Sequence, residues 1–251
     1  MSDTGATVTA RLDPAGAGIG IVAPFDLALD RELWRWTPEQ LSLYVTRTPP
    51  LDLLVSAEMA VALRDERALA TACRAVTAAA PGVMVYLCTS ASFVEGLAGE
   101  RQLRSVMERA GARRAVTTSG ALLEALAALG ARRVAVATPY DAELTARLVA
   151  FLSEAGHEVV GVASLGLRGD IWRVSRGTVC ELVESLPRRD ADAIVLSCTN
   201  LPTYDVIPPL EDAIGLPVVS ANLATMWAAL KALDALPTGR PERLFAERVR
   251  P

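Results

Sequence analysis

The chain carries the segment VMVYLCTS at residues 83–90 and a close counterpart, AIVLSCTN, at residues 193–200. Each is an apolar run, typical of a buried strand, that ends in Cys-Thr and a turn. A second pair, IVAPFD at residues 21–26 and VATPYD at residues 136–141, follows the same order. The members are 110 residues apart in the first pair and 115 in the second. Two matches in one order at nearly equal offsets indicate an internal duplication, so we predict two similar halves.

Around these segments, short β-branched runs alternate with longer helical patterns. The expected strands lie at residues 19–23, 53–56, 84–88, 115–117, 134–138, 159–164, 193–197 and 218–220, and the expected helices at residues 29–36, 58–80, 100–110, 121–128, 142–155, 171–185 and 223–236. This alternation indicates βαβ units and parallel sheets. We therefore predict an α/β fold of two pseudo-symmetric halves, each a mostly parallel sheet flanked by helices, with the active site in the cleft between them.

The duplication also suggests domain boundaries. We predict the first half at residues 1–117 and the second at residues 118–221. A C-terminal helix in residues 222–251 is expected to pack back on the first half. Residues 1–17 are expected to form a short frayed lead.

Composition argues against several classes of function. The 251 residues are 51% hydrophobic, with a formal net charge of −4 and no basic stripe, so nucleic acid is not an expected partner. No apolar run reaches the ~18 residues of a membrane span, and the N-terminus lacks a signal-peptide pattern. Four cysteines without a framework of close spacings indicate free thiols in a reducing compartment, so we expect a cytoplasmic protein.

Scarce residue types narrow the chemistry further. Lys231 is the single lysine and lies in an apolar-periodic helix, which makes it a poor Schiff-base amine. His157 is the single histidine and lies in a turn, so a serine triad or a His-rich metal site is hard to build. No P-loop motif occurs. We expect neither a cofactor nor a metal.

Two of the four cysteines are placed for chemistry. Cys88 and Cys198 come at the carboxyl ends of predicted parallel strands, where open sheets bind ligands. The start of the next helix lowers a thiol pKa there, because its positive end favours thiolate. The alternative is that each is a small buried hydrophobe, which is our interpretation of Cys73 and Cys180 inside amphipathic helices. Matched positions in a repeat favour the functional interpretation for Cys88 and Cys198.

The second repeated motif offers further polar groups. Tyr140 can donate its phenolic O–H to a substrate carboxylate, or pack as an aromatic residue on the cleft wall. Asp26 and Asp141 are interpreted as helix N-caps rather than as catalytic acids.

At these residues the chain resembles the aspartate/glutamate racemase superfamily, and most closely its branch of maleate cis-trans isomerase and arylmalonate decarboxylase. The resemblance runs from residue 18 to about residue 236. It is carried by YLCTS at residues 86–90, TPY at 138–140, LSCTNL at 196–201 and PVVSAN at 217–222.

The resemblance implies that Cys88 and Cys198 are the catalytic pair. It also implies a group of residues that bind the substrate carboxylate or its enediolate: Thr89, Ser90, Tyr140, Thr199 and Asn200. The decarboxylase branch keeps only the second cysteine, so the presence of both favours isomerase or racemase chemistry.

The chain also departs from the isomerase pattern. Those enzymes carry an asparagine shortly after the first-strand proline, where this chain has Phe25-Asp26-Leu27, and another near residues 167–170, where none occurs. An aspartate facing a dicarboxylate would repel it, which counts against maleate itself. Arg168 could supply a replacement carboxylate clamp.

We therefore expect a cofactor-independent, two-cysteine isomerase of a small carboxylate, similar to maleate cis-trans isomerase, that works through an enediolate-type intermediate. The alternatives are a racemase of an amino acid or hydantoin, an arylmalonate decarboxylase-like lyase, and a ligand-binding protein without catalysis. The expected partner is the small carboxylate alone, and the sequence leaves homo-oligomer formation open.

Overall fold

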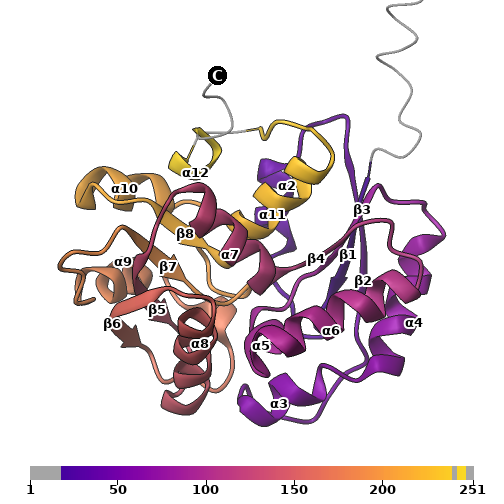
Figure 1. Ribbon diagram of the computed structural model, residues 1–251, viewed down its shortest axis with the longest axis horizontal. Coiled ribbons are helices and arrows are strands. Elements are labelled where there is room, and N and C mark those ends of the chain that lie inside the picture. Colours follow the sequence, from indigo (N-terminus) through magenta and orange to yellow (C-terminus); the bar gives the residue numbers. More distant parts are fainter. Residues whose placement is uncertain (1–17, 239–241, 247–251) are drawn as a thin grey trace, which may run out of the picture.

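The computed structural model describes residues 18–238 and 242–246, which form two four-stranded parallel sheets (Figure 1). The first sheet has the order β2-β1-β3-β4 and the second β6-β5-β7-β8. Their strands are β1 (Gly18–Ala23), β2 (Ser42–Arg47), β3 (Val83–Tyr86), β4 (Ala115–Thr117), β5 (Arg133–Thr138), β6 (Glu158–Ser164), β7 (Ala193–Leu196) and β8 (Val218–Ser220). The predicted α/β fold of two parallel sheets flanked by helices is confirmed.

The duplication is visible in the strand register. β1 and β5 begin 115 residues apart and both have six residues, while β3 and β7 begin 110 residues apart and both have four. Ile19 pairs with Val83 in the first sheet, and their counterparts Val134 and Ala193 pair in the second. The repeated motifs therefore occupy equivalent places in the two sheets.

Helices flank both sheets (Figure 1). They are α2 (Asp30–Trp36), α3 (Ala57–Ala62), α4 (Glu66–Thr77), α5 (Thr89–Phe93), α6 (Gly96–Arg109), α7 (Thr118–Ala128), α8 (Ala142–Glu154), the 3-10 turn η1 (Ile171–Arg173), α9 (Arg176–Glu184), α10 (Ile207–Ile214), α11 (Ala221–Ala232) and α12 (Arg243–Ala246). Polar caps begin several of them, since the first backbone N–H groups of a helix need acceptors. Asp141, for example, accepts from Leu144 N at 3.0 Å, which confirms its predicted N-cap role.

The helix α11 lies against both halves. It packs on α2, β3 and β4, and also on α7 and β8. Its residues 221–230 are all buried, which matches its lack of a polar face. The domain boundaries stay a prediction, and the parts of the predicted lead and tail at residues 1–17, 239–241 and 247–251 lie outside the described residues.

Several elements differ from those expected. The edge strand β2 and the helix α10 were not predicted, and residues 53–56 form no strand. In β2 (SLYVTR) three apolar residues stand in a row and Val45 is exposed, so the strand shows no period-2 apolar pattern. In α10, Pro208 and Pro209 lie in the first turn, where proline is tolerated, and make the helix harder to recognise from sequence. The single helices expected at 58–80 and 171–185 are interrupted where Asp65 and Ser175 cap new helices.

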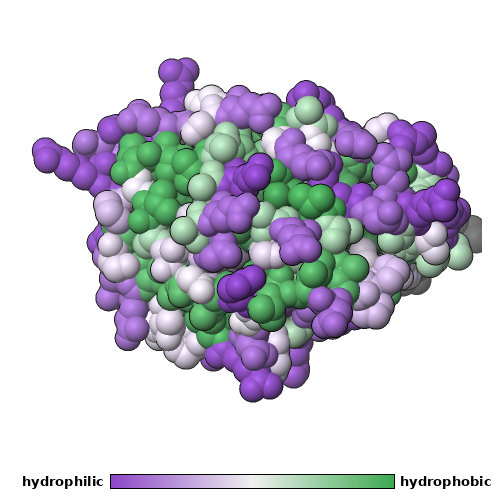
Figure 2. Space-filling model, turned by 90° about the horizontal axis from the view of Figure 1, so that it is seen from below, coloured by the Kyte–Doolittle hydropathy of each residue, from purple (hydrophilic) through white to green (hydrophobic). Residues whose placement is uncertain are grey.

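The surface seen from the side of α3 and α8 mixes residue types (Figure 2). Hydrophobic patches on this face are separated by hydrophilic side chains, so they form no single continuous apolar area there. Within the described ranges, no helix combines the length and apolarity needed to cross a membrane.

Candidate active site

A small cavity of about 30 Å³ lies where the two halves meet, at the carboxyl ends of the central strands. All seven sequence-predicted site residues line it, namely Cys88, Thr89, Ser90, Tyr140, Cys198, Thr199 and Asn200. The other lining residues are Pro24, Asp26, Val55, Met59, Leu63 and Ile171. The space holds about two water molecules.

The two cysteines come from opposite halves but differ in backbone conformation. Cys88 is extended, with φ −141°, and precedes the first residue of α5. Cys198 has φ 88°, a left-handed conformation that costs a non-glycine residue of order 1–3 kcal/mol. Both side chains are buried and neither forms a disulfide. Both thiols line the cavity, but the backbone at Cys198 is left-handed whereas that at Cys88 is extended, although the two residues hold equivalent places in the sequence repeat.

Burial dominates the protonation of both thiols. It raises the pKa of Cys88 to about 11 and that of Cys198 to about 12, because a thiolate is poorly solvated in the closed cavity. The backbone N–H groups of Ala91 and Asn200 lower the respective pKa values, but by less. The expectation that a helix start lowers both thiol pKa values is therefore wrong. The helix α5 begins directly after Cys88, but burial outweighs it, and after Cys198 no helix begins until Ile207.

Hydroxyl groups surround the thiols. Thr89 Oγ1 is buried and has no hydrogen-bond partner among the described residues, so it is available to a ligand. Ser90 Oγ lies 3.7 Å from Cys88 Sγ. Thr199 Oγ1 makes only a long contact, 3.5 Å, to the carbonyl oxygen of Leu87. These hydroxyls can hold a carboxylate or the oxyanions formed from it.

Two tyrosines stand beside the thiols. Ser197 Oγ donates to the Tyr140 hydroxyl at 3.3 Å, and a hydrogen bond from Tyr140 lowers the pKa of Cys198. Tyr140 also packs against the ring of Phe93, as the aromatic interpretation expected, and its donation to a substrate carboxylate stays a prediction. Tyr86 donates to Leu63 O at 2.7 Å and lies by Cys88, where it also lowers the thiol pKa. In the sequence, Tyr86 was part of a strand and of the YLCTS motif, but it was assigned no role at the site.

Asn200 joins the halves at the site. Its Nδ2 donates to the backbone carbonyl oxygen of Asp26 at 3.0 Å, and its Oδ1 accepts from Ala28 N at 2.8 Å. Both ends of the Asn200 amide thus bind the backbone of the turn after β1, and the role of Asn200 in substrate binding stays a prediction.

Asp26 is a site residue that the sequence motif assigned to a helix cap, although the departure from the isomerase pattern at residues 25–27 had raised an aspartate facing the substrate. The interpretation as a helix N-cap is wrong, because α2 begins only at Asp30 and Leu29 precedes it. Asp26 instead lines the cavity, and its charge raises the pKa of both cysteines. The signal in the sequence was the departure from the isomerase asparagine at residues 25–27.

An apolar wall completes the cavity, formed by Val55, Met59, Leu63 and Ile171. The sequence did not indicate this apolar wall, because its four residues resemble ordinary core positions. Beyond it lies an outer hollow of about 220 Å³, which Arg168 lines. The backbone N–H of Val55 donates to Arg168 O at 2.9 Å, so the loops of the two halves meet over the cavity.

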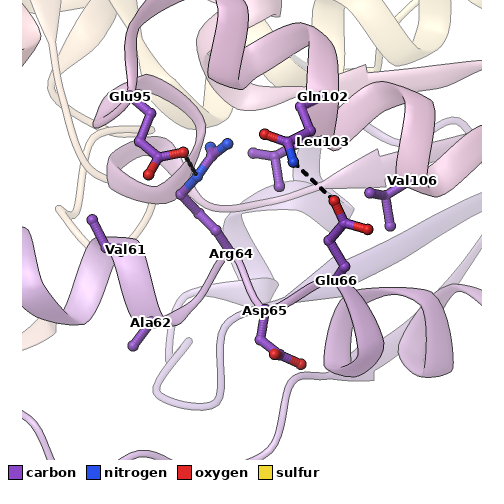
Figure 3. Close-up of a pocket in the computed structure, with 9 residues that line it drawn as sticks. All are labelled: Val61, Ala62, Arg64, Asp65, Glu66, Glu95, Gln102, Leu103 and Val106. Atoms are coloured by element: carbon purple, nitrogen blue, oxygen red, sulfur yellow. Dashed lines mark hydrogen bonds and ion pairs between the residues drawn. The ribbon is translucent and has the colours of Figure 1, made fainter.

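Another hollow, of about 360 Å³, lies beside α3, α4 and α6 (Figure 3). Its polar groups bind one another: Arg64 Nε contacts Glu95 at 2.8 Å, and Gln102 donates to Glu66 at 2.8 Å. Arg64 also donates to Ala91 O at 2.7 Å, which ties this wall to the helix that carries Thr89 and Ser90. The Arg64 side chain therefore helps to hold α5 in place next to the cavity.

Among the described residues, no cluster of three or more His, Cys, Asp or Glu side chains is arranged to hold a metal ion.

A family model described as arylmalonate decarboxylase matches residues 62–243. This chain belongs to that family. Arylmalonate decarboxylase of Bordetella bronchiseptica is 39% identical over 173 residues, which are 66% of this chain and 71% of that protein. Maleate isomerase of Geobacillus stearothermophilus is 31% identical over 160 residues, 61% of this chain and 64% of that protein.

Solved structures agree with this family. A liganded double mutant of arylmalonate decarboxylase has a TM-score of 0.83 and 32% identity, and the match covers 92% of this chain and 99% of that one. Another match is a cysteine-to-serine mutant of Nocardia farcinica maleate cis-trans isomerase with a covalently bound succinylcysteine intermediate. It has a TM-score of 0.79 and 26% identity, and the match covers 91% of this chain and 97% of that one. The resemblance to this branch of the superfamily is confirmed. These relatives include a decarboxylase and isomerases, so family membership alone selects neither activity.

Proposed function

We propose that this protein is a cofactor-independent isomerase of a small carboxylate, with Cys88 and Cys198 as its two catalytic thiols. The observation that carries the proposal is that both thiols, one from each half, line a single small cavity together with hydroxyl donors. The succinylcysteine in the Nocardia isomerase shows that cysteine addition occurs in a structural relative.

For a cis-trans substrate, the thiolate of one cysteine adds to the double bond and forms a C–S bond. The π electrons move to the α-carbon and its carboxylate, which becomes an enediolate. Hydroxyl donors such as Thr89 and Tyr140 stabilise this charge. Rotation about the resulting single bond, followed by cleavage of the C–S bond, gives the trans product and regenerates the thiolate.

The second thiol has a defined part. It can protonate the α-carbon of the adduct and take the same proton back before elimination, which makes the saturated thioether an intermediate. Each thiol then needs the opposite protonation state from its partner, so the pair titrates as a coupled unit. The Ala91 and Asn200 N–H groups favour the thiolate form once solvent or substrate enters.

Racemisation is the second candidate, because the two thiols come from opposite halves. One thiolate removes an α-proton and the other thiol returns a proton to the opposite face. The same cavity and the same oxyanion donors serve this reaction.

Proton NMR in D2O tests the proposal. The panel contains maleate, its monoamide, substituted malonates, amino acids and hydantoins. Cis-trans conversion or α-proton exchange supports the two-thiol isomerase, and exchange without a change of alkene geometry selects the racemase. Loss of CO2 from an arylmalonate, with no isomerisation of any compound, would replace the proposal with a lyase.

A further inference from the structure

Asp26 brings a carboxylate into the cavity that the proposed reaction does not use. It lies in the turn after β1 and lines both the closed cavity and the outer hollow. Of the described residues around the closed cavity, no other is acidic, and none is lysine, arginine or histidine. A substrate between the thiols therefore meets one acidic side chain and no basic one.

The place of Asp26 decides which end of the substrate it faces. Thr89, Ser90 and Tyr140 line the closed cavity but not the outer hollow, so their hydroxyl groups mark the inner end. Asp26 and Ile171 line both spaces and mark the outer end. A carboxylate held by the inner hydroxyls directs the far end of the molecule toward Asp26.

The protein only partly compensates the Asp26 charge. Arg47 of β2 donates from Nη1 to the carbonyl oxygens of Phe25 and Leu27, at 3.4 and 2.6 Å, on either side of Asp26. Arg47 and Asn200 lower the pKa of the Asp26 carboxyl, but burial raises it more. The carboxylate therefore keeps a desolvation cost that a donor on the substrate can offset.

We propose that Asp26 selects the substrate class: one carboxylate for the inner hydroxyls and, at the far end, a nitrogen that donates N–H to the Asp26 carboxylate. Amides and ammonium groups share this chemistry. The inference rests on the proposed function and narrows it. A second carboxylate would place two negative charges side by side, which opposes binding, whereas an N–H group forms a charge-assisted hydrogen bond.

The same contact suits the thiols. The negative charge of Asp26 opposes thiolate formation at both Cys88 and Cys198. An N–H group bound to Asp26 reduces that opposition, and an ammonium group reduces it most. The substrate class that Asp26 binds is therefore also the class that favours the ionised thiol.

Maleate and maleamate, its monoamide, test the inference because they share one shape and differ by a carboxylate against a carboxamide. Conversion of each by the full chain is followed by proton NMR at pH 8, and binding of each by calorimetry. We expect maleamate to be preferred about 100-fold in kcat/KM and in affinity. Asp26→Asn should bring this ratio to about one or below. The ammonium compound cis-4-aminobut-2-enoate, tested in parallel, separates an ammonium from an amide preference.

Asp170→Asn is the matched control. It removes one negative charge at the outer hollow, but Asp170 does not line the closed cavity, and its φ of 49° suits asparagine. We expect this variant to keep the wild-type ratio within about twofold. An equal shift in both variants would mean a general charge effect and would overturn the inference.

The outcomes for the two proposals are distinct. Efficient conversion of maleate, with a ratio that Asp26→Asn does not change, overturns the inference and leaves the isomerase intact. Preferred binding of maleamate without any conversion overturns the cis-trans activity and leaves the role of Asp26 intact. If none of the three probes binds, the inference fails.

Discussion

Asn200 donates from Nδ2 to the backbone carbonyl oxygen of Asp26 at 3.0 Å, across 174 positions of sequence. Asn200 lies two residues after Cys198, and Asp26 lies in the turn after β1 of the other half. The bond therefore fixes the acidic side of the cavity relative to the second thiol. A residue assigned to substrate binding by resemblance is, in its hydrogen bonds, a clamp between the halves.

Replacing Asn200 should affect both stability and turnover. Asn200→Ala leaves the Ala28 N–H and the Asp26 carbonyl oxygen without their side-chain partner, so we expect a loss of about 1–3 kcal/mol in the free energy of unfolding. Turnover should fall as well, because the cavity loses its alignment. Urea unfolding and steady-state kinetics measure the two effects. Gln102→Ala, which removes an exposed hydrogen bond to Glu66, is the control and should cost less than about 0.5 kcal/mol.

The two cysteines should act as a unit. We expect Cys88→Ala and Cys198→Ala each to lower kcat at least ~100-fold, the usual scale for a lost acid–base group. The double variant should lose far less than the product of the single losses, because residues of one mechanism are not additive. Near-normal turnover in Cys88→Ala, with Cys198→Ala inactive, would point to one-cysteine chemistry like that of the decarboxylase.

Activity should increase with pH across the neutral range. The closed-cavity pKa values are about 11 for Cys88 and about 12 for Cys198, so below pH 9 both groups are mainly thiols. Because the reactive form is the thiolate, its fraction rises with pH, and kcat/KM should rise up to about tenfold per unit between pH 7 and 9. A stopped assay in overlapping buffers measures this. A plateau already below pH 7.5 would show that one thiol is ionised in the free enzyme.

Alkylation should modify Cys180 first. Strand-end placement alone favours Cys88 or Cys198, but both are buried in the closed cavity, and Cys73 is buried in α4. Cys180 is half-buried on α9 and meets reagent directly. We expect iodoacetamide to label it at least about tenfold faster than the other three, because access limits the reaction. Peptide mapping over time gives the order, and faster labelling of Cys88 would mean that the cavity opens readily.

Local sequence patterns determined much of this protein. The repeated segments at 83–90 and 193–200 predicted the equivalent strands β3 and β7 and placed both cysteines at strand ends. Strand periodicity and chain order are local properties, so one sequence suffices to detect them. The edge strand β2 was missed because its short, half-exposed run SLYVTR carries no apolar–polar alternation.

Tertiary structure alone decided the chemistry around those cysteines. Asp26 looked like a helix cap, yet the fold aims it into the cavity, because α2 begins four residues later. A helix start was expected to give a low thiol pKa at both cysteines, but no helix begins after Cys198 until Ile207. Burial between the halves raises the pKa of both Cys88 and Cys198. Desolvation depends on every atom packed around a group, and the groups that enclose this cavity come from distant parts of the chain. Sequence therefore named the thiols, and only the closed interface of the two halves determined their protonation and the acidic neighbour they share.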